Sequence, residues 1–155
     1  MAKSYIQTMP QDAIELYTDL THMPEIKAME NFTAHGHTSV YDHSVNVTKL
    51  SVKLARGARM KSWKFEHLVM AAMLHDFYLY DYHGRRRQDG FHAWRHPERA
   101  LSNAEELFDL TPDVKNAIRC HMFPGTLFHM PLYAIGWIVS IADKICAIRE
   151  LIHRR

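Results

Sequence analysis

A histidine followed directly by an aspartate, His75-Asp76, is the pair in this sequence that points most clearly to chemistry. It ends an apolar run from Leu68 to Leu74, and helical periodicity turns both side chains towards the core. Burying an ionised carboxylate without a partner costs several kcal/mol, so a cation is expected beside Asp76. A bound metal ion is the simplest cation that satisfies both the imidazole and the carboxylate.

Further donors stand where the helical phase also points inward. His43 continues the apolar stripe of a helix predicted over 39–59, and Asp143 lies in the middle of an apolar helix predicted over 132–153. With the His-Asp pair they make a mixed nitrogen and oxygen ligand set, which suits divalent manganese, iron, cobalt, nickel or zinc. The aspartate of the pair has two oxygens and can bridge two ions. Two more histidines are then natural ligands of the second ion, His96 and His121.

Helices must position these residues, because helical periodicity runs along the whole chain and no alternating strand pattern is visible. The sequence therefore predicts an all-α, single-domain helical bundle. The last helix, 132–153, is predicted to be the most buried, since it is apolar nearly all round. The first 33 residues are predicted to form a helical segment packed on a core of residues 34–155. The other predicted helices cover 10–20, 24–32, 39–59, 62–80, 96–108 and 112–123.

Composition limits the class of function. The 155 residues are 47% hydrophobic, which is enough for one domain with a substantial core, and the formal net charge is only +2 at pH 7. Such a small charge argues against general binding of nucleic acid or of a membrane surface and favours a small-molecule partner. No apolar stretch reaches the length of a membrane span, and the N-terminus lacks a signal-peptide pattern, so we expect a cytoplasmic protein.

On this frame, the order of donors resembles the HD-domain superfamily of metal-dependent phosphohydrolases. The segments TSVYDHSVNVTKLSVKLA, AAMLHDFYLYDYH, RHPERALSNAEELF and SIADKICAIRE are similar to a branch of small bacterial single-domain HD hydrolases. The resemblance covers residues 34–150. It implies that one metal ion is held by four residues, His43, His75, Asp76 and Asp143. It implies a second ion at His96 and His121, although Met122 stands where two-metal members often have a further histidine.

The resemblance also implies hydrolysis of a phosphoester of a small metabolite or nucleotide. A bound metal lowers the pKa of water from ~15.7 towards ~7, and Asp76 is both a ligand and the residue best placed to orient that water. Arginine and histidine side chains suit the phosphate group. The residues expected to bind the substrate or to support the metal ligands are His35, Arg85, Arg86, Arg87, His92 and Lys144.

Two other functions stay open at this point. Some similar HD proteins use two irons to oxidise a small substrate with oxygen, and the same six ligands fit that chemistry. The second alternative is a module that keeps the metal cage but has lost turnover and binds a nucleotide or a partner. The sequence does not decide the metal, the number of ions or whether the chain forms a homo-oligomer.

Overall fold

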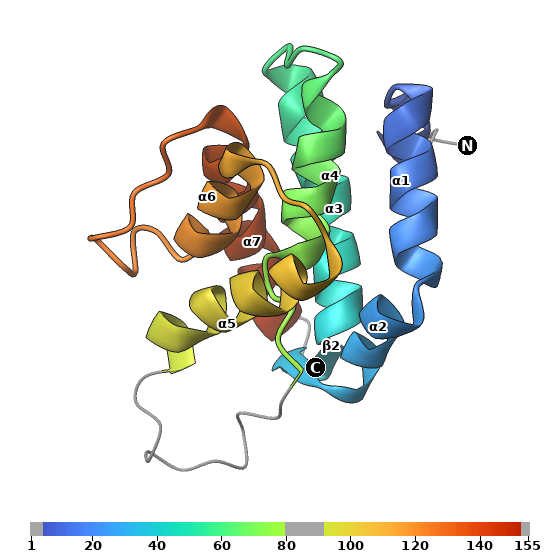
Figure 1. The fold of residues 1–155 in the computed structure, drawn as a ribbon. Helices are drawn as coiled ribbons and strands as arrows, with labels where there is room; N and C mark the ends of the chain where they lie inside the picture. Colours follow the sequence, from blue (N-terminus) through green and yellow to red (C-terminus); the bar gives the residue numbers. More distant parts are fainter. Residues whose placement is uncertain (1–4, 80–91, 153–155) are drawn as a thin grey trace.

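Helices dominate the computed structural model, which describes residues 5–79 and 92–152, with side chains described from residue 95 in the second range. The predicted all-α fold class is confirmed (Figure 1). In chain order the elements are η1 (Tyr5–Thr8), α1 (Gln11–His22), α2 (Pro24–Lys27), η2 (Ala28–Asn31), β1 (Thr33–His35), β2 (Thr38–Ser39), α3 (Val40–Gly57), α4 (Lys64–Leu74), α5 (His92–Leu107), α6 (Pro112–Cys120) and α7 (Ala134–Ile152).

Three helices, α3, α4 and α7, pack against one another at the centre of the molecule. α4 contributes the most continuous buried surface, because every residue from Ala71 to Leu74 is inaccessible to solvent, as are Leu68 and Val69. Burial of this apolar area is the main favourable term that holds the bundle together. α6 packs on α4 and α7, α5 packs on α6, and α1 lies along α4 (Figure 1).

A side-chain cap fixes the start of α3. The backbone N–H of Asp42 donates to Ser39 Oγ over 3.0 Å, and the Ser39 hydroxyl donates to Asp42 Oδ2 over 2.8 Å. This cap satisfies an otherwise unpaired backbone donor at the first turn and sets where the helix begins. His43 lies in that first turn and is completely buried.

Close packing between α6 and α7 brings their functional residues together. A Cβ atom at Gly136 would lie 3.0 Å from Pro131 Cβ and 3.5 Å from Ala117 Cα. The distance to Ala117 of α6 is an ordinary van der Waals contact, whereas the contact with Pro131, which precedes α7, is tight, so a larger residue at position 136 would first displace Pro131.

Several predicted helix ends are wrong. α4 ends at Leu74 rather than near residue 80, because the chain turns there through a hydrogen bond from Phe77 N–H to the Leu74 carbonyl. The His-Asp pair thus lies in the turn after the helix. α5 begins at His92 instead of residue 96, and the proline that suggested a first turn lies inside the helix. The predicted helix over 24–32 is one short α-helix followed by a 3-10 turn.

A short hairpin that the sequence did not indicate precedes α3. β1 and β2 pair in antiparallel fashion on either side of Gly36, whose φ of 63° is a conformation that favours glycine. Strands of three and two residues are too short to show an alternating pattern. The hairpin nevertheless matters for the site, because it places His35 beside the first turn of α3.

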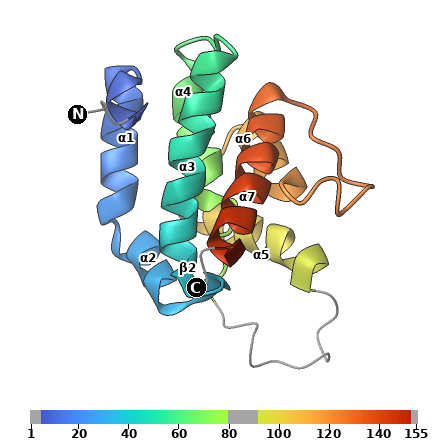
Figure 2. The same cartoon turned by 180° about the vertical axis from the view of Figure 1, so that it is seen from behind.

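α7 is less buried than its composition predicts. Its inner face is buried, but Trp137, Ile141 and Ile148 are 40%, 48% and 57% exposed. Figure 2 shows α7 at the front of the molecule. The prediction that it is the most buried helix is wrong, because an apolar sequence does not reveal whether neighbours cover every side. Within the described ranges no helix, α7 included, is both long and apolar enough to cross a membrane.

Candidate metal centre

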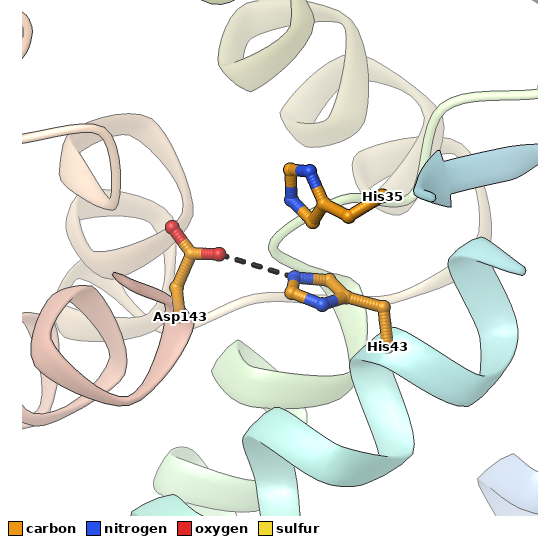
Figure 3. A group of neighbouring side chains, drawn as sticks. All are labelled: His35, His43 and Asp143. Carbon is orange, nitrogen blue, oxygen red and sulfur yellow. Dashed lines mark hydrogen bonds and ion pairs between the residues drawn. The ribbon is translucent and has the colours of Figure 1, made fainter. Parts of the chain in front are cut away.

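His43 is held between two carboxylates of α7. Its Nδ1 lies 2.8 Å from Glu150 Oε2. Its Nε2 lies 3.1 Å from Asp143 Oδ1 (Figure 3). Asn46 donates to the other oxygen of Glu150 over 3.1 Å and so fixes that carboxylate. A carboxylate behind a histidine is the usual device that orients a metal-binding imidazole, because it keeps the proton on the far nitrogen.

His75 is oriented by the backbone. Its Nδ1 donates to the Ala72 carbonyl over 2.8 Å, which leaves Nε2 as the nitrogen with a free electron pair. Nε2 is buried, and it has no hydrogen-bond partner among the residues that the structure describes. It lies 3.6 Å from Asp76 Oδ2 and 3.8 Å from Asp143 Oδ1. A buried polar atom in this state requires an explanation, and a cation between it and the carboxylates supplies one.

His121 is oriented in the same way on the other side of the site. Its Nδ1 donates to the Ile118 carbonyl over 2.7 Å, so its Nε2 also turns inward. That Nε2 lies 2.9 Å from Nε2 of His96, which comes from α5. The two histidines are buried, with 1% and 5% of their surfaces exposed. Two ring nitrogens therefore converge on the same small volume.

Asp76 lies between the two pairs of histidines and turns one oxygen to each. Its Oδ2 is 3.9 Å from His43 Nε2 and 3.6 Å from His75 Nε2. Its Oδ1 is 3.2 Å from His96 Nε2 and 3.3 Å from His121 Nε2. Oδ1 is buried and makes no hydrogen bond of acceptable geometry within the described part of the chain. The carboxylate thus divides the cluster into two groups of donors that share one residue.

Among the residues that the structure describes, four overlapping sets of three donors have ligand atoms within 4.8 Å of one another. Two of these sets contain Asp76, one with His43 and His75 and the other with His96 and His121. The donor atoms are imidazole nitrogens and carboxylate oxygens, which are common ligands of divalent transition metals. The orphaned atoms, the donor types and the inward orientation of the rings all fit a bound metal, so the buried cluster can hold a metal ion.

The electrostatics of the cluster also favour cations. Burial alone would raise the pKa of Asp76, but His75 and His121 hold it well below its usual range. Burial would likewise raise the pKa of Asp143, and the hydrogen bond with His43 keeps it low. The two aspartates therefore stay ionised at neutral pH although both are nearly inaccessible. Two negative charges in so small a volume attract a divalent ion strongly.

The histidines respond to the carboxylates in opposite ways. Burial lowers the pKa of His43, but hydrogen bonds with Asp143 and Glu150 outweigh it and raise the pKa to about 10. Burial lowers the pKa of His121 to about 4 in spite of Asp76. Without metal, His43 therefore carries a second ring proton at neutral pH, whereas His121 does not. Because a ligating imidazole nitrogen must be unprotonated, metal binding at this position releases that proton.

A comparison of the sequence with protein-family models identifies the family in which this arrangement of donors occurs. Residues 40–148 match the model of the HD domain. The chain belongs to the HD-domain family. Searches among curated proteins and among solved structures gave no significant match. HD domains typically bind divalent metals and are generally metal-dependent phosphohydrolases, and the matched range includes every residue that the sequence predicted as a metal ligand.

The structure brings together all six predicted ligands from three helices, α3, α5 and α7, and from the turns that follow α4 and α6. It adds His35, whose ring centroid lies 4.9 Å from that of His43 and whose donor atoms group with His43 and Asp143 (Figure 3). Lys144 donates to Asp143 Oδ2 over 3.0 Å and also to the His121 carbonyl. It therefore supports the ligands from behind and links α6 to α7.

Four of the side chains predicted to bind the substrate lie outside the described part of the chain, and two residues of the site were not predicted. Arg85, Arg86 and Arg87 lie outside the described residues, and so does the side chain of His92. Sequence reasoning missed Glu150 and its partner Asn46. The signal was present, because Glu150 follows Asp143 by seven residues and therefore lies on the same helix face two turns later. Nothing in that spacing showed that His43 of another helix would lie opposite.

Proposed function

We propose that this HD domain is a metal-dependent phosphohydrolase that cleaves a phosphoester of a small metabolite or nucleotide. The observation that supports it most directly is the divided carboxylate of Asp76, with two histidine nitrogens facing each of its oxygens. A carboxylate shared in this way is the arrangement expected where two divalent ions act on one phosphoryl group. The proposal includes two ions, although one would already occupy the first group of donors.

In the proposed reaction, some residues of the cluster bind the metal ions and others hold those ligands in position. His43, His75 and Asp143 would hold the first ion, His96 and His121 would hold the second, and Asp76 would belong to both. When bound, such ions supply a water whose pKa is lowered to about 7 and a positive charge for the phosphoryl oxygens. Glu150 fixes the ring of His43, and Lys144 fixes the carboxylate of Asp143. Both contacts keep the donor atoms in place without touching the substrate.

His35 is the described residue best placed to meet the substrate. It reaches the cluster from the hairpin rather than from the helical core, and it is partly exposed whereas the six ligands are buried. Its ring packs edge-on against His43 at an interplanar angle of 78°, so its nitrogens lie beside the first group of donors. We propose that His35 donates an N–H to a phosphoryl oxygen and orients it.

The burial of the cluster supports a small substrate. All six ligands are at most 6% exposed, so a reacting phosphorus must enter a confined space. A phosphate group on a small metabolite or nucleotide can do so more easily than the backbone of a folded nucleic acid. This restriction is consistent with the small net charge of the chain, which gives it no general attraction for polyanions.

A phosphoester screen tests the proposal. Full-length protein is loaded separately with Mn²⁺, Co²⁺ or Ni²⁺ and assayed for phosphate release from nucleoside monophosphates, sugar phosphates and other monoesters. We expect activity that disappears in Asp76→Ala and persists in His67→Gln, a histidine variant outside the cluster. Activity that survives in Asp76→Ala would exclude the cluster as its source.

The same preparation distinguishes the other functions. Anaerobically purified protein with two irons per chain, oxygen uptake with a small substrate and no phosphate release would replace the proposal with a di-iron oxygenase. Tightly bound metal with neither activity would indicate a binding module. Metal content by mass spectrometry and oxygen uptake by electrode are therefore measured beside phosphate release.

A further inference from the structure

A second concave site lies between α3 and α7, apart from the metal centre. The groove has a volume of about 410 Å³, within the range of small-molecule sites. None of the six metal ligands lines it. Its walls are Tyr5 of η1, Asn46, Lys49, Leu50 and Lys53 of α3, and Cys146, Arg149 and Glu150 of α7.

The charge in the groove is predominantly positive. Lys49 and Lys53 are one turn apart on the same face of α3, and Arg149 faces them from α7. Like charges at this spacing on a helix are mildly destabilising. The single acid of the lining is Glu150, and both its oxygens are already engaged, one by Asn46 and one by His43. An anion in the groove would therefore meet the ammonium groups of Lys49 and Lys53, and the carboxylate of Glu150 is already engaged.

The rest of the lining is apolar and partly aromatic. Leu50 and Cys146 form buried or half-buried parts of the wall, and the ring of Tyr5 is 46% exposed beside them. Lys53 lies with its Nζ 5.4 Å from the centre of that ring, so charge and aromatic surface adjoin each other. A ligand with an anionic group and a flat ring would satisfy both parts at once.

We propose that this groove is a second binding site, for a small phosphorylated molecule that carries a flat ring, such as a nucleoside monophosphate. The phosphate lies between Lys49, Lys53 and Arg149, and the ring packs on Tyr5 and Leu50. A solvated basic surface would explain scattered lysines, but it would not require a concave wall or an aromatic ring beside them. Glu150 separates the groove from His43, so the site is distinct from the one proposed for hydrolysis and does not depend on that function.

Isothermal titration calorimetry on the full chain in chelator tests the site directly. AMP is the probe, and adenosine, which lacks the phosphate, is titrated in parallel. Lys49→Ala/Lys53→Ala removes two cations of the groove, and Lys61→Ala/Lys115→Ala makes the same change of charge elsewhere on the surface. We expect saturable binding of one AMP per wild-type chain, an affinity at least tenfold weaker in the groove variant and within twofold of wild type in the control.

Three results would overturn the proposal. One is the absence of saturable AMP binding to the wild-type chain at millimolar concentrations. The second is an equal loss of affinity in both double variants, which would reflect general surface charge. The third is adenosine binding as tight as that of AMP, which would leave the cations without a role. Exposed lysines seldom decide stability, so both variants are expected to fold, and circular dichroism before titration checks this.

Discussion

Removal of the shared carboxylate should change the number of bound ions in a way that the geometry specifies. In Asp76→Asn, the group around His96 and His121 keeps no carboxylate, and the group around His43 and His75 keeps only Asp143. In His96→Gln, by contrast, the first group keeps all four donors. We expect about two ions per chain in the wild type, one in His96→Gln and fewer than one in Asp76→Asn.

The same variants also differ in how much bound metal should stabilise the folded protein. An ion present at about 1,000 times its dissociation constant stabilises the folded state by ~4 kcal/mol. In a domain of this size, one kcal/mol raises the midpoint of thermal unfolding by ~2–4 °C, so the wild type should gain ~8–16 °C for one such ion. His96→Gln should keep a gain of that order, whereas Asp76→Asn should gain less than about 4 °C.

Metal content by mass spectrometry and thermal unfolding by circular dichroism, with and without chelator, provide the two measurements. His67→Gln serves as the control, because His67 bonds to Asp113 outside the cluster and should leave two ions in place. Two ions retained in Asp76→Asn would refute the shared-carboxylate reasoning. Complete loss of metal in His96→Gln would refute the division into two groups.

Three further results are expected. Burial would raise the pKa of Asp113, but hydrogen bonds, above all the one with His67, lower it to about 2. The ionised Asp113 therefore stabilises the fold above pH 3.8, and this stabilisation is lost as the pH falls from 3.8 towards 2. Because its partner side chains are partly exposed, Asp113→Asn should lower the free energy of unfolding by only ~1–2 kcal/mol at pH 7, and urea titrations should show this difference shrinking below pH 4. Glu150→Ala should lower the pKa of His43 in the metal-free protein clearly below about 10, which NMR titration of the ring would detect; an unchanged value would contradict the assigned hydrogen bond. His35→Ala should raise KM for the phosphoester at least tenfold while the metal content stays at the wild-type level, and loss of metal instead would make His35 a ligand.

The sequence predicted the features that depend on residue type and helical phase. Apolar residues at three- and four-residue steps determine which side of a helix is buried, so the all-α class and the inward direction of His43, His75, Asp76 and Asp143 could be expected from local pattern alone. The ordered spacing of these donors also identified the HD domain, which the family match confirms. Their role as ligands stays a prediction until metal is measured.

Features that depend on contacts between distant segments could not be read in this way. Glu150 lies 107 positions from His43 in sequence, and only the packing of α7 on α3 brings their side chains to 2.8 Å. The hairpin that delivers His35 is too short to leave a pattern. The exposed side of α7 was mispredicted for a related reason, since composition says what a helix can bury but not what covers it.

The sequence by itself determined which chemical groups the chain can bring inward, because side-chain type and helical period are local properties. Tertiary structure alone decided which oxygen of Asp76 faces which histidines, which carboxylate supports His43, and that basic and aromatic side chains line a separate groove. These are relations between atoms on different elements, and they are fixed only when the helices pack at particular distances and angles.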